Sequence, residues 1–121
     1  MVKPDAFVEA CPSREVLARL GEKWSALIIA RLAGEPLRFT DLSQQVEGIS
    51  KKMLTQTLRN LERDGFVERR PAGSQRTAQV YYSLTSVGDS VLPIVLSAKQ
   101  WAEAHFEAVI EARARYNSKV E

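Results

Sequence analysis

Cysteine and histidine are almost absent from this sequence. The 121 residues include one cysteine, Cys11, and one histidine, His105. A single cysteine excludes an internal disulfide framework, and these two residues are too few soft ligands for a zinc site. The carboxylates show no metal-ligand spacing either. We therefore expect the protein to hold no metal and no other cofactor.

Long hydrophobic runs are missing as well. No apolar run approaches the roughly 20 residues that a helix needs to span a bilayer. The first five residues, Met1 to Asp5, contain no apolar signal core and include an acid. With 45% hydrophobic and 26% charged residues, the composition is that of an ordinary globular protein. We expect a single domain over residues 1–121, a cytoplasmic location and no membrane partner.

The residue constellations of an enzyme are also missing. The sequence has no paired carboxylates, no nucleophile accompanied by a base, and no glycine loop that would cradle a phosphate. Its six glycines are scattered as terminators of predicted elements. We predict that the protein is not an enzyme.

The segment from Phe39 to Leu84 has the punctuation of a helix-turn-helix followed by a hairpin. A turn at residues 47–50 separates a short helix from a longer one. Gly48 can adopt the positive φ that ends the first helix, and Ser50 can cap the second. Two strands joined by a basic loop follow, which predicts a winged helix-turn-helix.

The helix predicted over residues 50–64 separates its side chains by face. At 100° per residue, Leu54, Leu58 and Leu61 share one side, with Met53 and Thr57 at its margin. The opposite side combines cations with an amide, groups that contact base edges and phosphates. Its members are Lys52, Gln56, Arg59 and Arg63, flanked by Thr55 and Asn60.

Positive charge is concentrated in the same segment. Residues 50–84 contain seven basic and three acidic side chains, a net charge of +4, whereas residues 1–49 and 85–121 each carry −1. A polyanion would be attracted to this segment, and its binding would weaken steeply with salt. The alternative interpretation is a solvated helix face that needs charge for solubility.

The rest of the chain predicts helices on both sides of this segment. Residues 1–10 form an arm, and a helix capped by Ser13 follows over residues 14–20. A second helix, from residue 23 or 24 to residue 32, is apolar on most sides and should be central. Thr40 is expected to cap a short helix over residues 41–46.

The hairpin is predicted from strands at residues 66–70 and 79–84, because Val80, Tyr82 and Leu84 alternate to one face. Arg76 in the loop over residues 71–78 could enter a minor groove, or it could be an incidental loop arginine. A last helix, capped by Thr85, is expected over residues 86–116 with a kink at Pro93, and residues 117–121 are expected to fray.

Apolar positions recur along most of this last helix. The stripe consists of Val87, Val91, Ile94, Val95, Ala98, Trp101, Ala102, His105, Phe106, Val109 and Ala112. It is longer than so small a domain can cover, so a second subunit is the simplest cover. The alternative is that the stripe folds back on its own core. The residues predicted at the dimer interface are Leu17, Leu96, Trp101, His105, Phe106 and Val109.

Several motifs occur together in an order that resembles one known family. They are Cys11-Pro12, Gly21-Glu22-Lys23-Trp24, Arg38-Phe39-Thr40-Asp41-Leu42, Gly48-Ile49-Ser50-Lys51-Lys52-Met53-Leu54, Leu58-Arg59-Asn60-Leu61-Glu62-Arg63-Asp64-Gly65 and Tyr82-Ser83-Leu84-Thr85. Over residues 11–105 the chain resembles the HxlR-type family of bacterial transcriptional regulators, a branch similar to the MarR winged-helix proteins.

The resemblance implies a mainly α fold with a small β-hairpin, and a homodimer that binds a pseudo-palindromic operator in double-stranded DNA. Residues 39–64 would be the helix-turn-helix and residues 66–84 the wing. Residues 1–20 and 85–118 would form the dimer. The chain departs from the family before the last strand, where relatives often have prolines and an acid and this chain has Arg76-Thr77-Ala78-Gln79-Val80-Tyr81.

The predicted DNA contacts fall into three groups. Those expected to read bases or phosphates are Lys52, Gln56 and Arg59. Those expected to touch phosphate at the start of the same helix are Ser50, Lys51 and Thr55. Arg38 and Thr40 would contact the DNA backbone at the preceding helix start. Thr40 could instead be only a cap.

Cys11 has two interpretations. Several members of the HxlR-type family, which this chain resembles, sense oxidants or electrophiles through a cysteine in this N-terminal position. In addition, a thiol near a helix start can have a lowered pKa. It could also be an inert, partly buried cysteine. Likewise Trp24, Trp101 and Phe106 could line a pocket for a small-molecule effector between subunits, or they could serve only in packing.

The leading functional prediction is a sequence-specific regulator that represses a nearby operon. Half-sites about one helical turn apart are expected for a dimer of this kind. The alternative is a protein-interaction module that keeps the winged-helix scaffold without binding specific DNA. The basic segment argues against that alternative.

Overall fold

The computed structural model describes residues 3–72 and 79–119. Its elements are α1 (Ser13–Leu20), α2 (Lys23–Arg31), β1 (Leu37–Arg38), α3 (Phe39–Gln45), α4 (Lys51–Arg63), β2 (Val67–Ala72), β3 (Gln79–Leu84) and α5 (Ser86–Lys119). The fold is a winged helix-turn-helix, mainly helical with a small antiparallel sheet. This confirms the predicted fold class.

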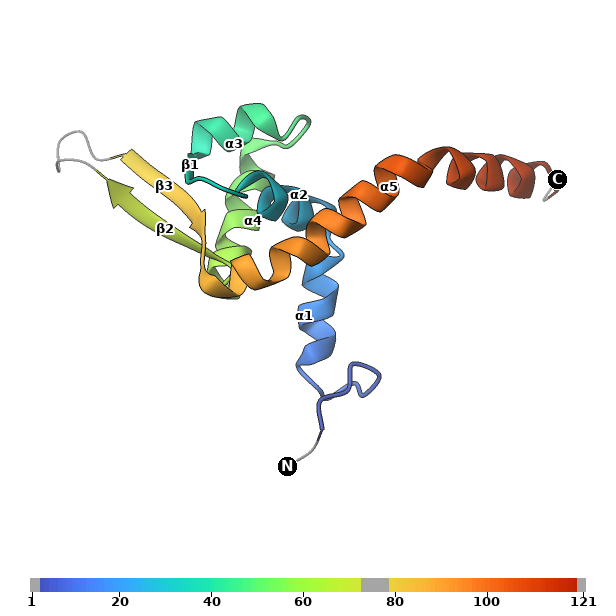
Figure 1. Ribbon diagram of the computed structural model, residues 1–121, viewed down its shortest axis with the longest axis horizontal. Coiled ribbons are helices and arrows are strands. Elements are labelled where there is room, and N and C mark those ends of the chain that lie inside the picture. Colours follow the sequence, from blue (N-terminus) through green and yellow to red (C-terminus); the bar gives the residue numbers. More distant parts are fainter. Residues whose placement is uncertain (1–2, 73–78, 120–121) are drawn as a thin grey trace.

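The elements radiate from a small body built by α2, α3, α4 and the start of α5 (Figure 1). The β2–β3 hairpin projects from one side of this body, and α5 extends far beyond it on the other side. Helix α1 and the N-terminal arm leave the body in a third direction. None of the described helices combines the length and the apolar character needed to cross a membrane.

The sheet has three strands in the order β1-β3-β2, all antiparallel. Strand β1 was not predicted, because two residues are too few to show the alternation by which a strand is recognised. The first wing strand was predicted too early, since β2 begins at Val67 and continues through Pro71. Proline is tolerated there because β2 is an edge strand.

The core surrounds α2. Among the described residues, five apolar side chains are completely buried, two on α2 and three on α3 and α4: Ile28, Ile29, Leu42, Leu54 and Leu61. Helix α2 contacts α1, α3, α4 and α5, so the prediction that it is central is confirmed. On the hairpin, Tyr82 and Leu84 pack against this core from one face, as the alternating pattern predicted.

Two of the four predicted helix caps are confirmed. The backbone N–H of Met53 donates to the Ser50 hydroxyl at 3.0 Å, at the start of α4. At the start of α5, the backbone N–H of Gly88 donates to the Thr85 hydroxyl at 3.1 Å. Both hydroxyls therefore satisfy a helix-start donor that has no partner within the helix.

The cap predicted at Thr40 is wrong. Helix α3 starts two residues earlier than predicted, at Phe39, and its N-cap residue is Arg38. The Asp41 carboxylate accepts a hydrogen bond from the backbone N–H of Arg38 at 2.9 Å. An acid in the first turn reaches back to stabilise the helix start, so the hydroxyl of Thr40 is not needed there.

The cap predicted at Ser13 is also wrong. The N-cap position of α1 belongs to Pro12, and Ser13 is the first helical residue. The Ser13 hydroxyl lies 3.0 Å from Sγ of Cys11 instead of accepting from the helix. A proline whose φ of −59° already suits a helix starts α1 without a side-chain cap.

Helix α5 is longer than predicted. It runs through Pro93 and ends at Lys119, so residues 117–119 are helical where fraying was expected. The kink at Pro93 stays a prediction. Near its start α5 lies so close to the hairpin that a Cβ on Gly88 would be 2.1 Å from the carbonyl oxygen of Phe66. Only glycine permits this approach.

Candidate nucleic-acid interface

A tight turn separates α3 from α4. Gly48 has a φ of +91°, a left-handed conformation that residues with a side chain rarely adopt. Ile49 is buried just after it, and Ser50 then caps α4. Lys51 and Ser50 are both exposed at the entering end of the helix, as predicted.

Helix α4 separates apolar from polar side chains as the sequence predicted. Its buried residues are Leu54, Thr57, Leu58 and Leu61. Thr57, expected at the margin, is 4% exposed and belongs to the buried face. The polar residues on the opposite side are exposed: Lys52, Gln56, Arg59 and Arg63. Four groups able to contact bases or phosphates thus share one accessible surface of α4, and their contact with DNA remains a prediction.

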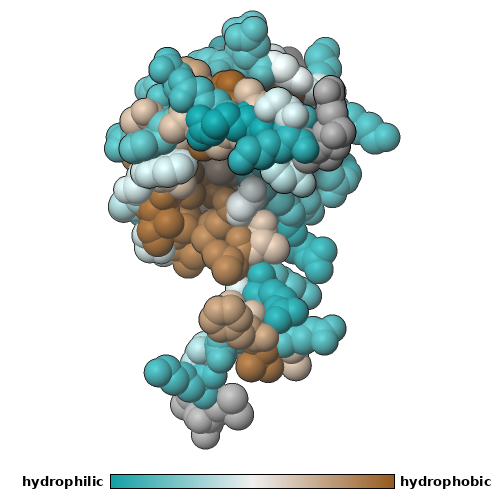
Figure 2. Space-filling model, turned by 90° about the vertical axis from the view of Figure 1, so that its right-hand side faces the viewer, coloured by the Kyte–Doolittle hydropathy of each residue, from teal (hydrophilic) through white to brown (hydrophobic). Residues whose placement is uncertain are grey.

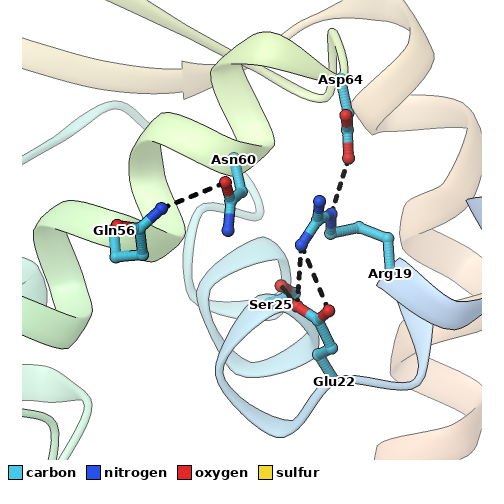
Figure 3. A network of polar contacts seen from close by, with 6 residues as sticks. All are labelled: Arg19, Glu22, Ser25, Gln56, Asn60 and Asp64. Atoms are coloured by element: carbon cyan, nitrogen blue, oxygen red, sulfur yellow. Dashed lines mark hydrogen bonds and ion pairs between the residues drawn. The ribbon is translucent and has the colours of Figure 1, made fainter.

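Gln56 has a neighbour on this surface. Its side-chain amide donates to the side-chain oxygen of Asn60 at 3.4 Å (Figure 3). The long distance makes this a weak hydrogen bond. It orients the Gln56 amide and uses only one of its N–H groups. The Gln56 carbonyl and one N–H remain able to pair with adenine.

Arg38 lies at the join between β1 and α3. Its guanidinium contacts the Asp41 carboxylate at 3.5 Å and the Gln79 side-chain oxygen at 3.4 Å. Hydrogen bonding from Arg38, chiefly from its backbone N–H, lowers the pKa of Asp41. The predicted contacts of Arg38 and Thr40 with the DNA backbone remain predictions. Thr40 is exposed.

A depression of about 410 Å³ lies between α4 and the hairpin. It is lined by Phe39, Thr55, Leu58, Arg59, Glu62, Arg69 and Tyr82. Thr55, a predicted phosphate contact, is half-buried at this depression rather than on the outer surface. The sequence analysis did not single out Arg69. Arg76 lies outside the described residues.

The far end of α4 is held by an ion-pair network that the sequence analysis also missed. Asp64, the C-cap residue of α4, accepts from Nε of Arg19 at 2.7 Å. The same guanidinium donates to both oxygens of Glu22, at 3.0 and 3.2 Å, and Ser25 donates to Glu22 at 3.2 Å (Figure 3). The hydrogen bond with Asp64 raises the pKa of Arg19. The network ties α4 to α1 and α2.

Cys11 lies just before α1 and is partly buried. Hydrogen bonds from Ser13, first from its hydroxyl and then from its backbone, lower the pKa of the thiol, and the backbone of Asp5 adds to this effect. Nearby, the Arg14 guanidinium donates to the carbonyls of Ala6 and Phe7 at 3.1 and 2.8 Å, which folds the arm against α1. The thiol is therefore both accessible and acidified.

Apolar side chains remain exposed along α1 and α5. Those more than half exposed include Leu17, Ile94, Trp101, Phe106, Ile110 and Tyr116. A largely apolar groove of about 440 Å³ also runs between the α1–α2 turn and α5. Figure 2 shows apolar surface gathered on this side of the molecule, above the N-terminal arm.

The other predicted interface residues on α5 lie in different settings. Leu96 and Val109 are half-buried. The His105 ring stacks on Trp101 with 4.7 Å between ring centroids. Trp24 packs against the core of its own subunit, whereas Trp101 and Phe106 are exposed, so these aromatic residues do not share one environment within a single chain. In residues 3–72 and 79–119, no three side chains of histidine, cysteine, aspartate or glutamate gather where they could hold a metal ion.

This chain is similar to known proteins in both sequence and fold. A family profile described as HxlR-like helix-turn-helix matches residues 19–110. The uncharacterized HTH-type transcriptional regulator YtfH of Escherichia coli is 40% identical over 107 residues, 88% of this chain and 84% of that protein. The solved structure of YtfH from Salmonella typhimurium is 38% identical, with a TM-score of 0.81 over 93% of this chain and 99% of that chain.

Two further similar structures are those of an oxidized redox regulator and of a quinone-bound protein. The oxidized form of the redox regulator HypR is 36% identical, with a TM-score of 0.70 over 78% of this chain and 96% of that chain. Quinone-bound YodB from Bacillus subtilis is 32% identical, with a TM-score of 0.63 over 78% of this chain and 99% of that chain. The family match confirms the predicted resemblance. This family consists of transcriptional regulators, not of enzymes. The chain belongs to the HxlR-like helix-turn-helix family of HTH-type transcriptional regulators.

Proposed function

We propose that this regulator is a homodimer that binds a pseudo-palindromic operator and represses transcription from it. The observation that carries the proposal is the exposed polar face of α4, opposite a buried leucine seam. In each subunit α4 would enter the major groove, with Gln56 at a base edge and Arg59 at guanine or the adjacent phosphate. The hairpin would lie along the neighbouring backbone or minor groove.

The dimer is supported by the exposed apolar surface of α1 and α5. Apolar patches of this extent, rimmed by polar residues, usually mark a protein interface. A two-fold interface uses the same patch on both subunits, so α5 and α1 of one copy would cover the corresponding surface of the other. Two copies of α4 would then face one side of a duplex, about one helical turn apart.

The experiment is selection of bound duplexes from a random pool, followed by affinity measurement on the selected repeat. Replacing Gln56 and Arg59 together by alanine should bring affinity for the repeat down to that for random DNA, because the base-reading groups are gone. Arg31→Ala, which removes an exposed arginine on α2, serves as the control. Undiminished discrimination by the double variant would contradict the assignment. Transcription from a promoter that overlaps the repeat distinguishes repression from activation.

We further propose that Cys11 makes the regulator responsive to electrophiles. Its lowered pKa and partial exposure support this, as does the likeness to proteins described as a redox regulator and as quinone-bound. The thiolate would add to a quinone ring to form a thioether, and the ring would take up the electron pair and a proton from water. DNA selection with and without a quinone, on the parent and on Cys11→Ser, tests the response.

Ser13→Ala should slow alkylation of Cys11 by iodoacetamide at pH 7. Without the hydroxyl the thiol pKa rises, so a smaller fraction of Cys11 is thiolate at pH 7. The greater nucleophilicity of the more basic thiolate offsets only about half of this effect on the logarithm of the rate, so alkylation becomes slower. The difference should narrow as the pH rises above both pKa values. Ser118→Ala, at the far end of α5, is the control. Equal rates for the parent and Ser13→Ala would exclude this role of the hydroxyl.

A further inference from the structure

The two adjacent arginines of β2 lie on opposite faces of the hairpin. Successive residues of a strand alternate between faces, and residues directly opposite one another on paired strands share a face. Arg69 is paired with Tyr82, and Arg70 is paired with Tyr81. Tyr82 packs toward the core, so Arg69 extends from the face that α4 covers.

Arg69 faces the depression between the hairpin and α4. The same depression is lined by Arg59 and the half-buried Thr55, both on α4. One acid, Glu62, also lines it. Among the described residues no ion pair involves Arg59 or Arg69, and both are exposed. Two guanidinium groups and a hydroxyl therefore surround a space with one carboxylate.

Arg70 is in the opposite situation. Its guanidinium forms an ion pair with Glu68 at 2.7 Å on the outer face of the hairpin. It lines a different depression, together with Glu35 and Tyr81. Arg70 thus already has an acidic partner and lies on the face away from α4.

We propose that Arg69 and Arg59 together bind one phosphate of the DNA backbone in the depression between α4 and the hairpin. This inference rests on the proposed function and adds Arg69 to the DNA-contacting residues. Guanidinium groups bind phosphate through two parallel N–H bonds, and an anion between Arg59 and Arg69 removes the repulsion of their like charges. The bound phosphate would hold the hairpin in a fixed position relative to the helix that reads the bases.

Each phosphate contact contributes to the salt dependence of binding. The logarithm of the affinity falls with the logarithm of the salt concentration, with a slope of about −0.9 for each phosphate neutralised on duplex DNA. The test uses the full chain and a labelled random-sequence 20-base-pair duplex over a salt series. Arg69→Gln should make the slope less steep, by less than about one because Arg59 still contacts the phosphate. Arg70→Gln should leave the slope unchanged, although both variants remove one charge from the same strand.

Two further variants sharpen the test. Arg69→Lys keeps the charge but loses the planar fork, so it should weaken binding with little change in slope. Glu62→Gln should strengthen binding, because it removes the carboxylate from the depression. Thermal unfolding checks that each variant folds. If Arg69→Gln does not fold, Arg69→Lys and Glu62→Gln decide the question.

The outcomes separate this inference from the proposed function. No binding of the parent to DNA at low salt would overturn the proposed function itself. Binding by the parent, with Arg69→Gln matching it in slope or Arg70→Gln losing as much, would overturn only the phosphate site. The same holds if neither Arg69→Lys nor Glu62→Gln changes affinity.

Discussion

Gly88→Ala is expected to lower the thermal unfolding midpoint by about 10 °C. Its added Cβ would lie 2.1 Å from the Phe66 carbonyl oxygen and 3.2 Å from Leu84 side-chain atoms. The first distance is a clash with backbone, which cannot rotate away, so α5 must shift from the hairpin. Overpacking of this kind costs about 3 kcal/mol, and a domain of this size loses about 3 to 4 °C for each kcal/mol.

The same substitution at Gly21 provides a matched control. Gly21 follows α1 with a φ of −83°, and an added Cβ would meet nothing closer than 3.6 Å. Gly21→Ala should therefore change the midpoint by at most a few degrees, and a small increase is possible because alanine restricts the unfolded chain. Unfolding followed by circular dichroism measures both variants. Equal midpoints for Gly88→Ala and the parent would mean that α5 does not approach the hairpin so closely.

A side chain added at position 88 would affect the candidate nucleic-acid interface as well as stability. The Thr85 hydroxyl, which caps α5 through Gly88, donates to the carbonyl oxygen of Gly65 just after α4. The residues that end α4 and begin α5 are thus bonded directly to each other. Displacement of α5 at this point would also displace the end of the helix proposed to read DNA.

Patterns within one element were enough to predict most of α4. The 3.6-residue period placed Leu54 and Leu61 inside and Gln56 and Arg59 outside, and the structure agrees. The turn was predictable for the same reason. Gly48 and Ser50 act on their immediate neighbours, so their chemistry is visible in a short stretch of sequence.

Features that depend on distant residues were not predictable in this way. Arg19 and Asp64 are 45 positions apart, and only the packing of α1 on the end of α4 brings them together. The depression that contains Arg69 likewise exists only once the hairpin folds against α4. Strand β1 is defined by its pairing with β3, since two residues are too few to show a strand pattern in the sequence.

The misplaced caps have a more local cause. Thr40 and Ser13 were expected to act because threonine and serine are common caps, but each had a competitor nearby. Asp41 reaches back to the Arg38 backbone, and the fixed φ of Pro12 already starts α1. A preference of about 1 kcal/mol is easily outweighed by another group that satisfies the same donors.

The largest effect on function is expected from Trp101→Glu combined with Phe106→Glu on α5. Both side chains are more than half exposed in the single chain, at 58% and 52%, so charging them should leave the folded subunit intact. In the proposed dimer they would be buried, and two unpaired carboxylates there would prevent association. Light scattering should report a monomer, and affinity for the selected repeat should fall about 10²- to 10⁴-fold.

This loss has a distinct origin from the loss caused by the α4 variants. A monomer keeps its base-reading face but must bind each half-site separately, so it loses the high effective concentration that one half supplies to the other. Its affinity for an isolated half-site should match that of one parent subunit. Gln100→Glu with Ser118→Glu adds the same charge to exposed positions on the other side of α5 and should leave the dimer intact. A variant at residues 101 and 106 that remains dimeric and binds the repeat at full strength would show that α5 pairs through another face, because no buried interface accommodates four unpaired carboxylates without a large cost.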